Sequence, residues 1–185
     1  MSERVLVAGV GNIFLGDDGF GSEVARRLAS EVLPHDVTVT DFGIGGIHLA
    51  YELLEGYETA ILVDASPRGE EPGTVYVLEA DRDETVDAPT DLPVGMAGVL
   101  ADAHAMEPGS VLDMIGALGV STRVLVVGCE PADVDERIGL SPPVQRAVDE
   151  ALRVVLELLE SNADTTDRVD STSGSSEGPS TRKES

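Results

Sequence analysis

The chain has 185 residues, 12 Lys and Arg against 35 Asp and Glu, a net charge of −23 and 42% hydrophobic residues. This length suits one domain with a substantial core, whereas the negative charge excludes general nucleic-acid binding and a basic membrane-surface helix. No apolar run approaches the roughly 18 residues of a membrane span, and the N-terminus lacks the pattern of a signal peptide. The single cysteine, Cys129, excludes an internal disulfide, so we expect a protein of the reducing cytoplasm.

The acidic residues are spread along the whole chain, and the only lysine, Lys183, lies near the C-terminus. A lysine-poor acidic surface keeps a protein soluble in concentrated salt, where ions screen the repulsion between carboxylates. We interpret it as an adaptation to a salty, halophilic cytoplasm. Because most of these carboxylates are then solvent-facing, a functional acid has to be identified from its position rather than from the abundance of acids.

Strand-like and helix-like segments alternate along the chain. Runs of aliphatic and β-branched residues predict strands at 4–10, 36–41, 59–63, 74–78 and 122–127. Amphipathic spacing predicts helices at 18–32, 47–54, 110–118 and 142–160, the first with Val24, Leu28 and Val32 on one face. The alternation predicts an α/β fold: a three-layer sandwich in which a twisted, mostly parallel five-stranded sheet has helices on both faces. Too few residues precede the fourth strand for a crossover helix, so we predict that it is an antiparallel edge strand.

We expect a single α/β domain over residues 1–160 and a disordered tail over residues 161–185. The tail is rich in Ser, Thr, Gly and Asp, and it contains one aliphatic residue larger than Ala. Such a segment buries too little apolar surface to offset the entropy that it would lose on ordering.

A glycine-rich loop, Gly9–Gly19, follows the first predicted strand, where dinucleotides bind in many α/β proteins. The dinucleotide fingerprint requires glycine where Phe14 stands, and a phosphate-binding P-loop requires Lys and Ser or Thr where Asp17 and Asp18 stand. Two carboxylates at that place would repel phosphate, which disfavours nucleotide binding. The adjacent acids indicate either a helix cap or a site for a cation.

Two further acids end predicted strands. Asp64 follows the third strand, and Asp41 ends the second, just before the glycine-rich segment Gly43–Gly46, which suits the approach of an extended peptide. Binding sites of open α/β sheets form beyond the carboxyl ends of the strands. Either acid is therefore placed to share a crevice with the loop after the first strand, and a turn cap is the alternative interpretation of Asp64.

The chain has three histidines: His35 in a polar turn, His48 in a predicted helix and His104 in a loop of small residues. Two carboxylates and one imidazole suit a borderline divalent ion such as zinc or nickel, and they leave coordination positions open. HExxH and paired CxxC zinc motifs are absent from the sequence. A Cys129 nucleophile with His104 as its base is an alternative, although a cysteine at a strand end is more often a buried apolar residue.

Taken together, several motifs resemble those of the NiFe-hydrogenase maturation endopeptidases. The matching segments extend over residues 4–160, and their order and spacing carry the resemblance. The segments are Val7–Asn12, Gly16–Gly21, Asp41–Gly43 with Gly46, Leu62–Ala65, His104 with Leu112, Val127–Pro131 and Ile138–Ser141.

The resemblance implies a cytoplasmic, metal-dependent endopeptidase that removes the C-terminal extension of a NiFe-hydrogenase large-subunit precursor after nickel insertion. The metal-contacting trio of the family falls on Asp18, Asp64 and His104, which are the predicted catalytic and metal-binding residues. The substrate supplies the nickel, and zinc or cadmium could substitute for it in vitro. Some members carry Glu where this chain has the shorter Asp18, and members vary around His104.

On this interpretation, the three side chains complete the coordination of the precursor's nickel, which polarises the scissile carbonyl and acidifies an attacking water. Asp17 or Asp41 could accept the proton, and the sequence does not choose between them. The precursor is the expected partner of a monomeric enzyme that binds neither nucleic acid nor membrane. Two alternatives stay open: a non-catalytic nickel-binding or docking factor and, less favoured, a small-molecule hydrolase.

Overall fold

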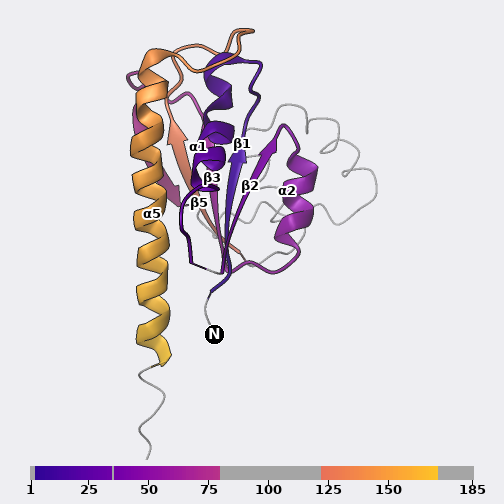
Figure 1. The fold of residues 1–185 in the computed structure, drawn as a ribbon, viewed down its shortest axis with the longest axis vertical. Helices are drawn as coiled ribbons and strands as arrows, with labels where there is room; N and C mark the ends of the chain where they lie inside the picture. Colours follow the sequence, from indigo (N-terminus) through magenta and orange to yellow (C-terminus); the bar gives the residue numbers. More distant parts are fainter. Residues whose placement is uncertain (1–2, 35, 80–121, 171–185) are drawn as a thin grey trace, which may run out of the picture.

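A computed structural model describes residues 3–34, 36–79 and 122–170, and for residues 163–170 it describes the backbone alone. The fold is built on a five-stranded sheet in the order β2-β1-β3-β5-β4 (Figure 1). The helix predicted at 110–118 lies outside the described residues. The strands are β1 (Val5–Val10), β2 (Val37–Gly43), β3 (Thr59–Ala65), β4 (Val75–Glu79) and β5 (Arg123–Cys129). The helices are the single 3-10 turn η1 (Gly16–Gly19), α1 (Phe20–Leu28), α2 (Gly46–Leu53) and α5 (Pro142–Asp170).

The sheet is mostly parallel with an antiparallel edge, as predicted. β1 pairs in parallel with β2 and β3, and β3 pairs in parallel with β5, whereas β4 runs antiparallel to β5. In the parallel register, Gly9 lies opposite both Asp41 and Val63, and Asp64 lies opposite Gly128. The carboxyl ends of the four parallel strands therefore meet at one edge of the sheet, which we call the carboxyl edge.

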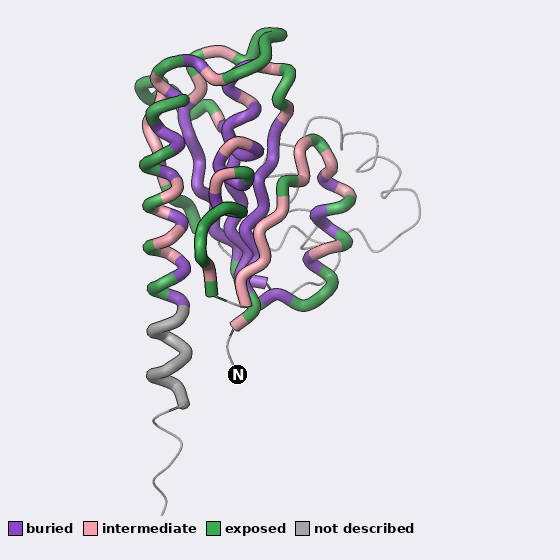
Figure 2. The backbone as a smooth tube through the Cα atoms, viewed as in Figure 1, coloured by how far each residue is buried: buried purple, intermediate pink, exposed green. Residues whose placement is uncertain are grey.

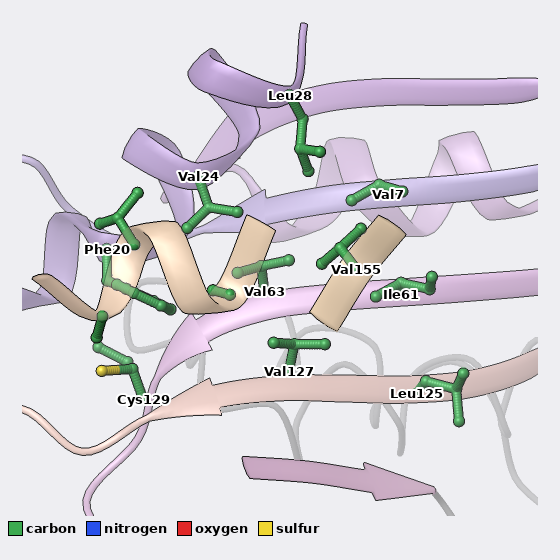
Figure 3. Packing of buried hydrophobic residues seen from close by; sticks show 14 of the residues in the cluster. Val7, Phe20, Val24, Leu28, Ile61, Val63, Leu125, Val127, Cys129 and Val155 are labelled. Atoms are coloured by element: carbon green, nitrogen blue, oxygen red, sulfur yellow. The ribbon is translucent and has the colours of Figure 1, made fainter. Parts of the chain in front are cut away.

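Helices cover both faces of the sheet, which completes the predicted three-layer sandwich. α1 and α5 pack on one face and α2 on the other (Figure 1). Along β1, Val5 and Val7 point into the first core, and Leu6 and Ala8 point into the second, as the two-residue period of a strand requires. Burying a Val, Leu or Phe side chain contributes about 1.5–3 kcal/mol to the free energy of folding. The core shown in Figure 3 therefore stabilises the sheet from whose carboxyl edge the loops extend.

The first helix is shorter than predicted. The segment predicted as one helix over 18–32 forms η1 and then α1, which ends at Leu28. Val24 and Leu28 are fully buried, but Val32 is fully exposed. The chain turns after α1 to reach β2, because Ser30 and Glu31 donate backbone hydrogen bonds within a turn rather than continuing the helix. Val32 therefore fits the i+4 spacing in the sequence, but its side chain is not part of the buried face of α1.

The last helix is longer than predicted. α5 continues to Asp170, ten residues beyond the predicted end of this helix, while residues 171–185 lie outside the described part. Extending an existing helix is much easier than nucleating one. At Asn162 the helix also gains a tertiary contact, because the Arg123 guanidinium donates a hydrogen bond to the Asn162 amide oxygen. Within the described ranges, none of the helices combines the length and the apolar character needed to cross a membrane.

Candidate active site at the carboxyl edge of the sheet

The glycines after β1 allow the backbone to pack closely. At Gly11, whose φ is +132°, an added Cβ would collide with the carbonyl oxygen of Asp18. At Gly21, in the first turn of α1, an added Cβ would collide with the carbonyl oxygens of Val10 and Val63. Glycine is thus required for η1 and α1 to lie directly against the ends of β1 and β3.

Asp18 lies in η1 and is partly buried. Its Oδ2 accepts a hydrogen bond of 2.7 Å from the backbone N–H of Asn12, which orients the carboxylate. Burial raises the pKa of Asp18 above its ordinary value, and the Asn12 N–H offsets part of this effect. Its Oδ1 accepts no hydrogen bond from the described residues, so the turn holds the side chain while one oxygen stays available to a ligand.

Asp64 is the penultimate residue of β3 and is 4% exposed. The Ser66 hydroxyl donates a hydrogen bond of 3.3 Å to Asp64 Oδ2. Ser66 is itself held by two neighbours: its N–H donates to the Cys129 carbonyl at 3.0 Å, and its carbonyl accepts from the Tyr76 hydroxyl at 2.7 Å. The turn that follows β3 therefore fixes the surroundings of Asp64, in agreement with the turn interpretation of the sequence.

Asp18 and Asp64 lie on contacting elements at the same edge, because η1 packs against β3. His104, the third residue of the predicted trio, lies outside the described residues, as does His35. The described ranges contain no group of three or more His, Cys, Asp or Glu side chains that could hold a metal ion. The two carboxylates are thus the part of the predicted trio that the structure describes.

Asp17, although adjacent to Asp18, faces the opposite way into the protein and is fully buried. Its carboxylate accepts hydrogen bonds from the N–H groups of Ala132 (2.8 Å), Asp133 (3.3 Å) and Ser141 (2.6 Å), and from the Ser141 hydroxyl (2.8 Å). Burial alone would raise the pKa of Asp17, but these hydrogen bonds outweigh it and lower the pKa. Asp17 therefore ties the loop after β1 to the loop after β5.

Asp41, the other predicted proton acceptor, is exposed on β2 near its carboxyl end. Its Oδ1 accepts hydrogen bonds from the Ser22 hydroxyl at 2.7 Å and from the Gly43 N–H at 3.0 Å. The Gly11 N–H donates to the Gly43 carbonyl at 3.0 Å, which joins this strand end to the loop after β1. Of the two candidates, only Asp41 is open to solvent.

Cys129 is not placed to act as a nucleophile. It is fully buried in the core beside Phe20 and Val127 (Figure 3), and burial raises the pKa of its thiol to about 12. A thiolate is the reactive form of cysteine, and this environment opposes it. The apolar interpretation of Cys129 is therefore confirmed.

His48, the histidine that the structure does describe, is exposed on α2.

The residues that orient the acids were not identified from the sequence. Asn12 orients Asp18, Ser22 contacts Asp41, and Ser141 binds Asp17 from 124 positions along the chain. These are ordinary polar residues in loops or in the first turn of a helix, and the contacts of Asp41 and Asp17 are long-range ones that arise only when the strands assemble.

Known proteins resemble the chain over most of its length. Residues 22–158 match the hydrogenase maturation protease family. The hydrogenase 2 maturation protease of Escherichia coli is 30% identical over 158 residues, which cover 84% of this chain and 90% of the relative. The coenzyme F420 hydrogenase subunit delta of Methanothermobacter thermautotrophicus is 30% identical over 162 residues, with 83% and 93% covered.

Solved structures share the fold. The hydrogenase 2 maturation peptidase from a Thaumarchaeota archaeon superposes with a TM-score of 0.65 and 32% identity, over 85% of this chain and 99% of the other. The hydrogenase maturating endopeptidase of E. coli gives a TM-score of 0.66 and 29% identity, over 85% and 93%. The family match, the sequence identity and the shared architecture agree. The chain belongs to the hydrogenase maturation protease family, a family of peptide hydrolases.

Proposed function

We propose that this chain removes the C-terminal extension of a NiFe-hydrogenase large-subunit precursor once nickel has been inserted. Membership of the maturation protease family supports the reaction class. The observation that carries the proposal is the pair of carboxylates, Asp18 and Asp64, on contacting elements at the carboxyl edge. His104 is the third proposed ligand, on the basis of the sequence resemblance.

In this proposal the nickel belongs to the substrate. Carboxylate oxygens and an imidazole nitrogen are suitable donors for a borderline divalent ion, and zinc or cadmium would substitute for nickel in vitro. Asp18, Asp64 and His104 bind the metal of the loaded precursor and thereby hold the adjacent peptide bond at the site. The bound ion supplies Lewis acidity toward the scissile carbonyl.

The same arrangement makes processing depend on nickel insertion. A precursor without nickel offers the three side chains no cation, so its extension is not held at the carboxyl edge. The partly buried carboxylate of Asp18 favours a cation as its partner, because burial disfavours an unpaired charge.

Neither Asp17 nor Asp41 is suitably placed to accept the proton of the attacking water. The Asp17 carboxylate is fully buried and already accepts four hydrogen bonds. Asp41 is exposed, but its side chain leaves β2 on the face that α1 covers, where Ser22 donates to it. Asp64 is in phase with Leu62 and therefore leaves β3 on the α2 face. A general base has to lie within reach of the proton that it accepts.

The test compares nickel-loaded and nickel-free precursor, each incubated with the purified chain and analysed by intact-protein mass spectrometry. We expect the loaded precursor alone to lose the mass of its extension. Equal trimming of both would contradict the dependence on nickel. Unchanged mass of a loaded precursor that still binds the chain would indicate the docking factor instead.

A matched pair of variants tests the site. Asp64→Asn removes a proposed ligand with little change in shape, whereas Glu55→Gln neutralises an exposed acid at the opposite edge of the sheet. We expect the first variant to lose processing and the second to retain it. Normal processing by Asp64→Asn would refute the proposed site.

A further inference from the structure

Two loops at the carboxyl edge expose a group of apolar side chains, which we call the apolar tip: Ile13, Phe14, Val134 and Ile138. Their exposed fractions are 51%, 62%, 50% and 78%. Among the described residues, ten large hydrophobic side chains are exposed, and these two loops carry four of them. Figure 2 shows that the loops at this end of the molecule are largely exposed, in contrast to the buried strands below them. Apolar side chains gathered on an exposed surface often mark a binding site.

Hydrogen bonds between the two loops hold the apolar tip in place. Leu15 and Arg137 form a bridge, in which the Arg137 N–H donates to the Phe14 carbonyl at 2.9 Å and the Gly16 N–H donates to the Arg137 carbonyl at 2.8 Å. Phe14 and Ile138 are thus the immediate neighbours of a bridged pair. The Asp17 carboxylate adds a buried connection to the second loop. A preorganised surface of this kind loses little entropy when a partner binds.

The apolar tip adjoins the proposed catalytic acid. Ile13 lies over Gly19, where an added Cβ would come within 3.1 Å of the Ile13 Cα. The residue before it, Asn12, orients the Asp18 carboxylate. A macromolecule bound at the apolar tip would therefore extend over the proposed metal-binding site.

The charge around the apolar tip indicates the chemistry of its partner. Asp135 and Glu136 are exposed between Val134 and Ile138. Arg137, the next residue, is paired with Asp133 at 2.9 Å and lies 3.8 Å from Asp17. Apolar side chains with exposed carboxylates beside them complement an apolar protein surface that carries Arg or Lys. They do not complement a phosphate-bearing ligand.

We infer that the apolar tip is the docking surface for the folded body of the large-subunit precursor, through an apolar patch flanked by basic residues. The inference rests on the proposed function, and it separates recognition of the folded substrate from the binding of its metal. Docking at the apolar tip supplies affinity for the folded body of the precursor, while Asp18 and Asp64 bind only its metal.

The experiment measures binding and processing separately. In full-length Asp64→Asn protein, binding of nickel-loaded precursor is measured by calorimetry with and without Phe14→Ser/Ile138→Ser. We expect the double variant to raise Kd about tenfold, because exposed anchors that become buried on binding typically contribute this much. In the active background, KM should rise by a similar factor while kcat stays within about twofold.

The control is Val32→Ser/Leu54→Ser, which removes two exposed apolar side chains at the opposite edge of the sheet. We expect wild-type affinity from this control, and thermal unfolding of both double variants should match the wild type, because the altered side chains are exposed. The charge is tested by Asp135→Asn/Glu136→Gln, for which we expect Kd to rise about threefold, against no change for Glu31→Gln/Glu55→Gln.

The outcomes distinguish the inference from the proposed function. If the wild type trims the precursor but Phe14→Ser/Ile138→Ser binds and trims normally, the docking inference is wrong and the proposed function stands. If the wild type binds without trimming and the double variant weakens binding, docking stands and the peptidase proposal fails. If the wild type neither binds nor trims, both are overturned.

Discussion

Asp17 and Asp18 are adjacent acids in one turn, yet they belong to two different regions of the molecule. Asp17 faces inward, where three N–H groups and one hydroxyl from the loop after β5 surround its carboxylate. Asp18 faces the carboxyl edge and accepts one hydrogen bond, from Asn12. The first carboxylate is saturated by the protein itself, and the second retains capacity for a ligand.

The difference has a clear electrostatic signature. The hydrogen bonds to Asp17 lower its pKa despite its burial, whereas burial raises the pKa of Asp18. A buried charge needs several donors to replace the water that it loses. The comparison teaches that, in so acidic a chain, the hydrogen bonds around a carboxylate separate a structural acid from a candidate catalytic one.

The largest expected effect is on activity, from Asp18→Asn. An amide is a poorer metal ligand than a carboxylate, so we expect processing of nickel-loaded precursor to fall by more than about 100-fold. The free energy of unfolding should change little or rise slightly, since a partly buried charge is removed. Timed mass spectrometry and urea unfolding check the two expectations. If Asp18→Asn retained processing, Asp18 would not be a catalytic acid, and the contrast with the structural acid Asp17 would fail.

The second effect is on stability, from Asp17→Asn. The amide nitrogen cannot accept the hydrogen bonds that one carboxylate oxygen now accepts, so we expect a loss of about 3 kcal/mol in the free energy of unfolding. Ser141→Ala is the milder companion, because it removes one hydroxyl donor and should cost about 1 kcal/mol. Urea denaturation measures both. An unchanged stability of Asp17→Asn would mean that this carboxylate does not hold the two loops together.

The pH dependence sharpens the same comparison. Because the folded-state pKa of Asp17 lies below the ordinary value of 3.8, its ionisation stabilises the folded state above that value and ceases to do so as the pH falls through the folded pKa. The stability difference between the wild type and Asp17→Asn should therefore be constant above about pH 5 and shrink below about pH 4. Urea titrations from neutral to acidic pH follow this difference, which would stay level if the carboxylate were not stabilised by its donors.

The smallest effect is expected from Cys129→Ala. The side chain is fully buried, so we expect a stability loss of about 1 kcal/mol, with processing unchanged at temperatures well below unfolding. The folded wild type should also react very slowly with a thiol reagent, because its thiol has a pKa of about 12. Abolished processing in a folded Cys129→Ala protein would reopen the cysteine mechanism.

Local pattern accounts for the parts of the fold that were predicted correctly. The β-branched runs and their spacing predicted the five strands and the antiparallel edge, because a strand's composition and the length of its connections are encoded locally. Helix ends were predicted less well: Val32 matched the amphipathic spacing but lies beyond α1, and α5 continues past residue 160. Both boundaries depend on contacts with other segments.

The sequence by itself therefore determined the mostly parallel sheet with its antiparallel edge strand, the edge at which Asp18, Asp41 and Asp64 would lie, and the family to which the chain belongs. Only the tertiary structure decided which acid in the Asp17–Asp18 pair is structural, because the donors of Asp17 come from residues more than 110 positions away. It also decided that Cys129 is a core residue and that Phe14 and Ile138 share one exposed surface. Burial and long-range hydrogen bonding arise only on assembly of the strands, so no local pattern encodes them.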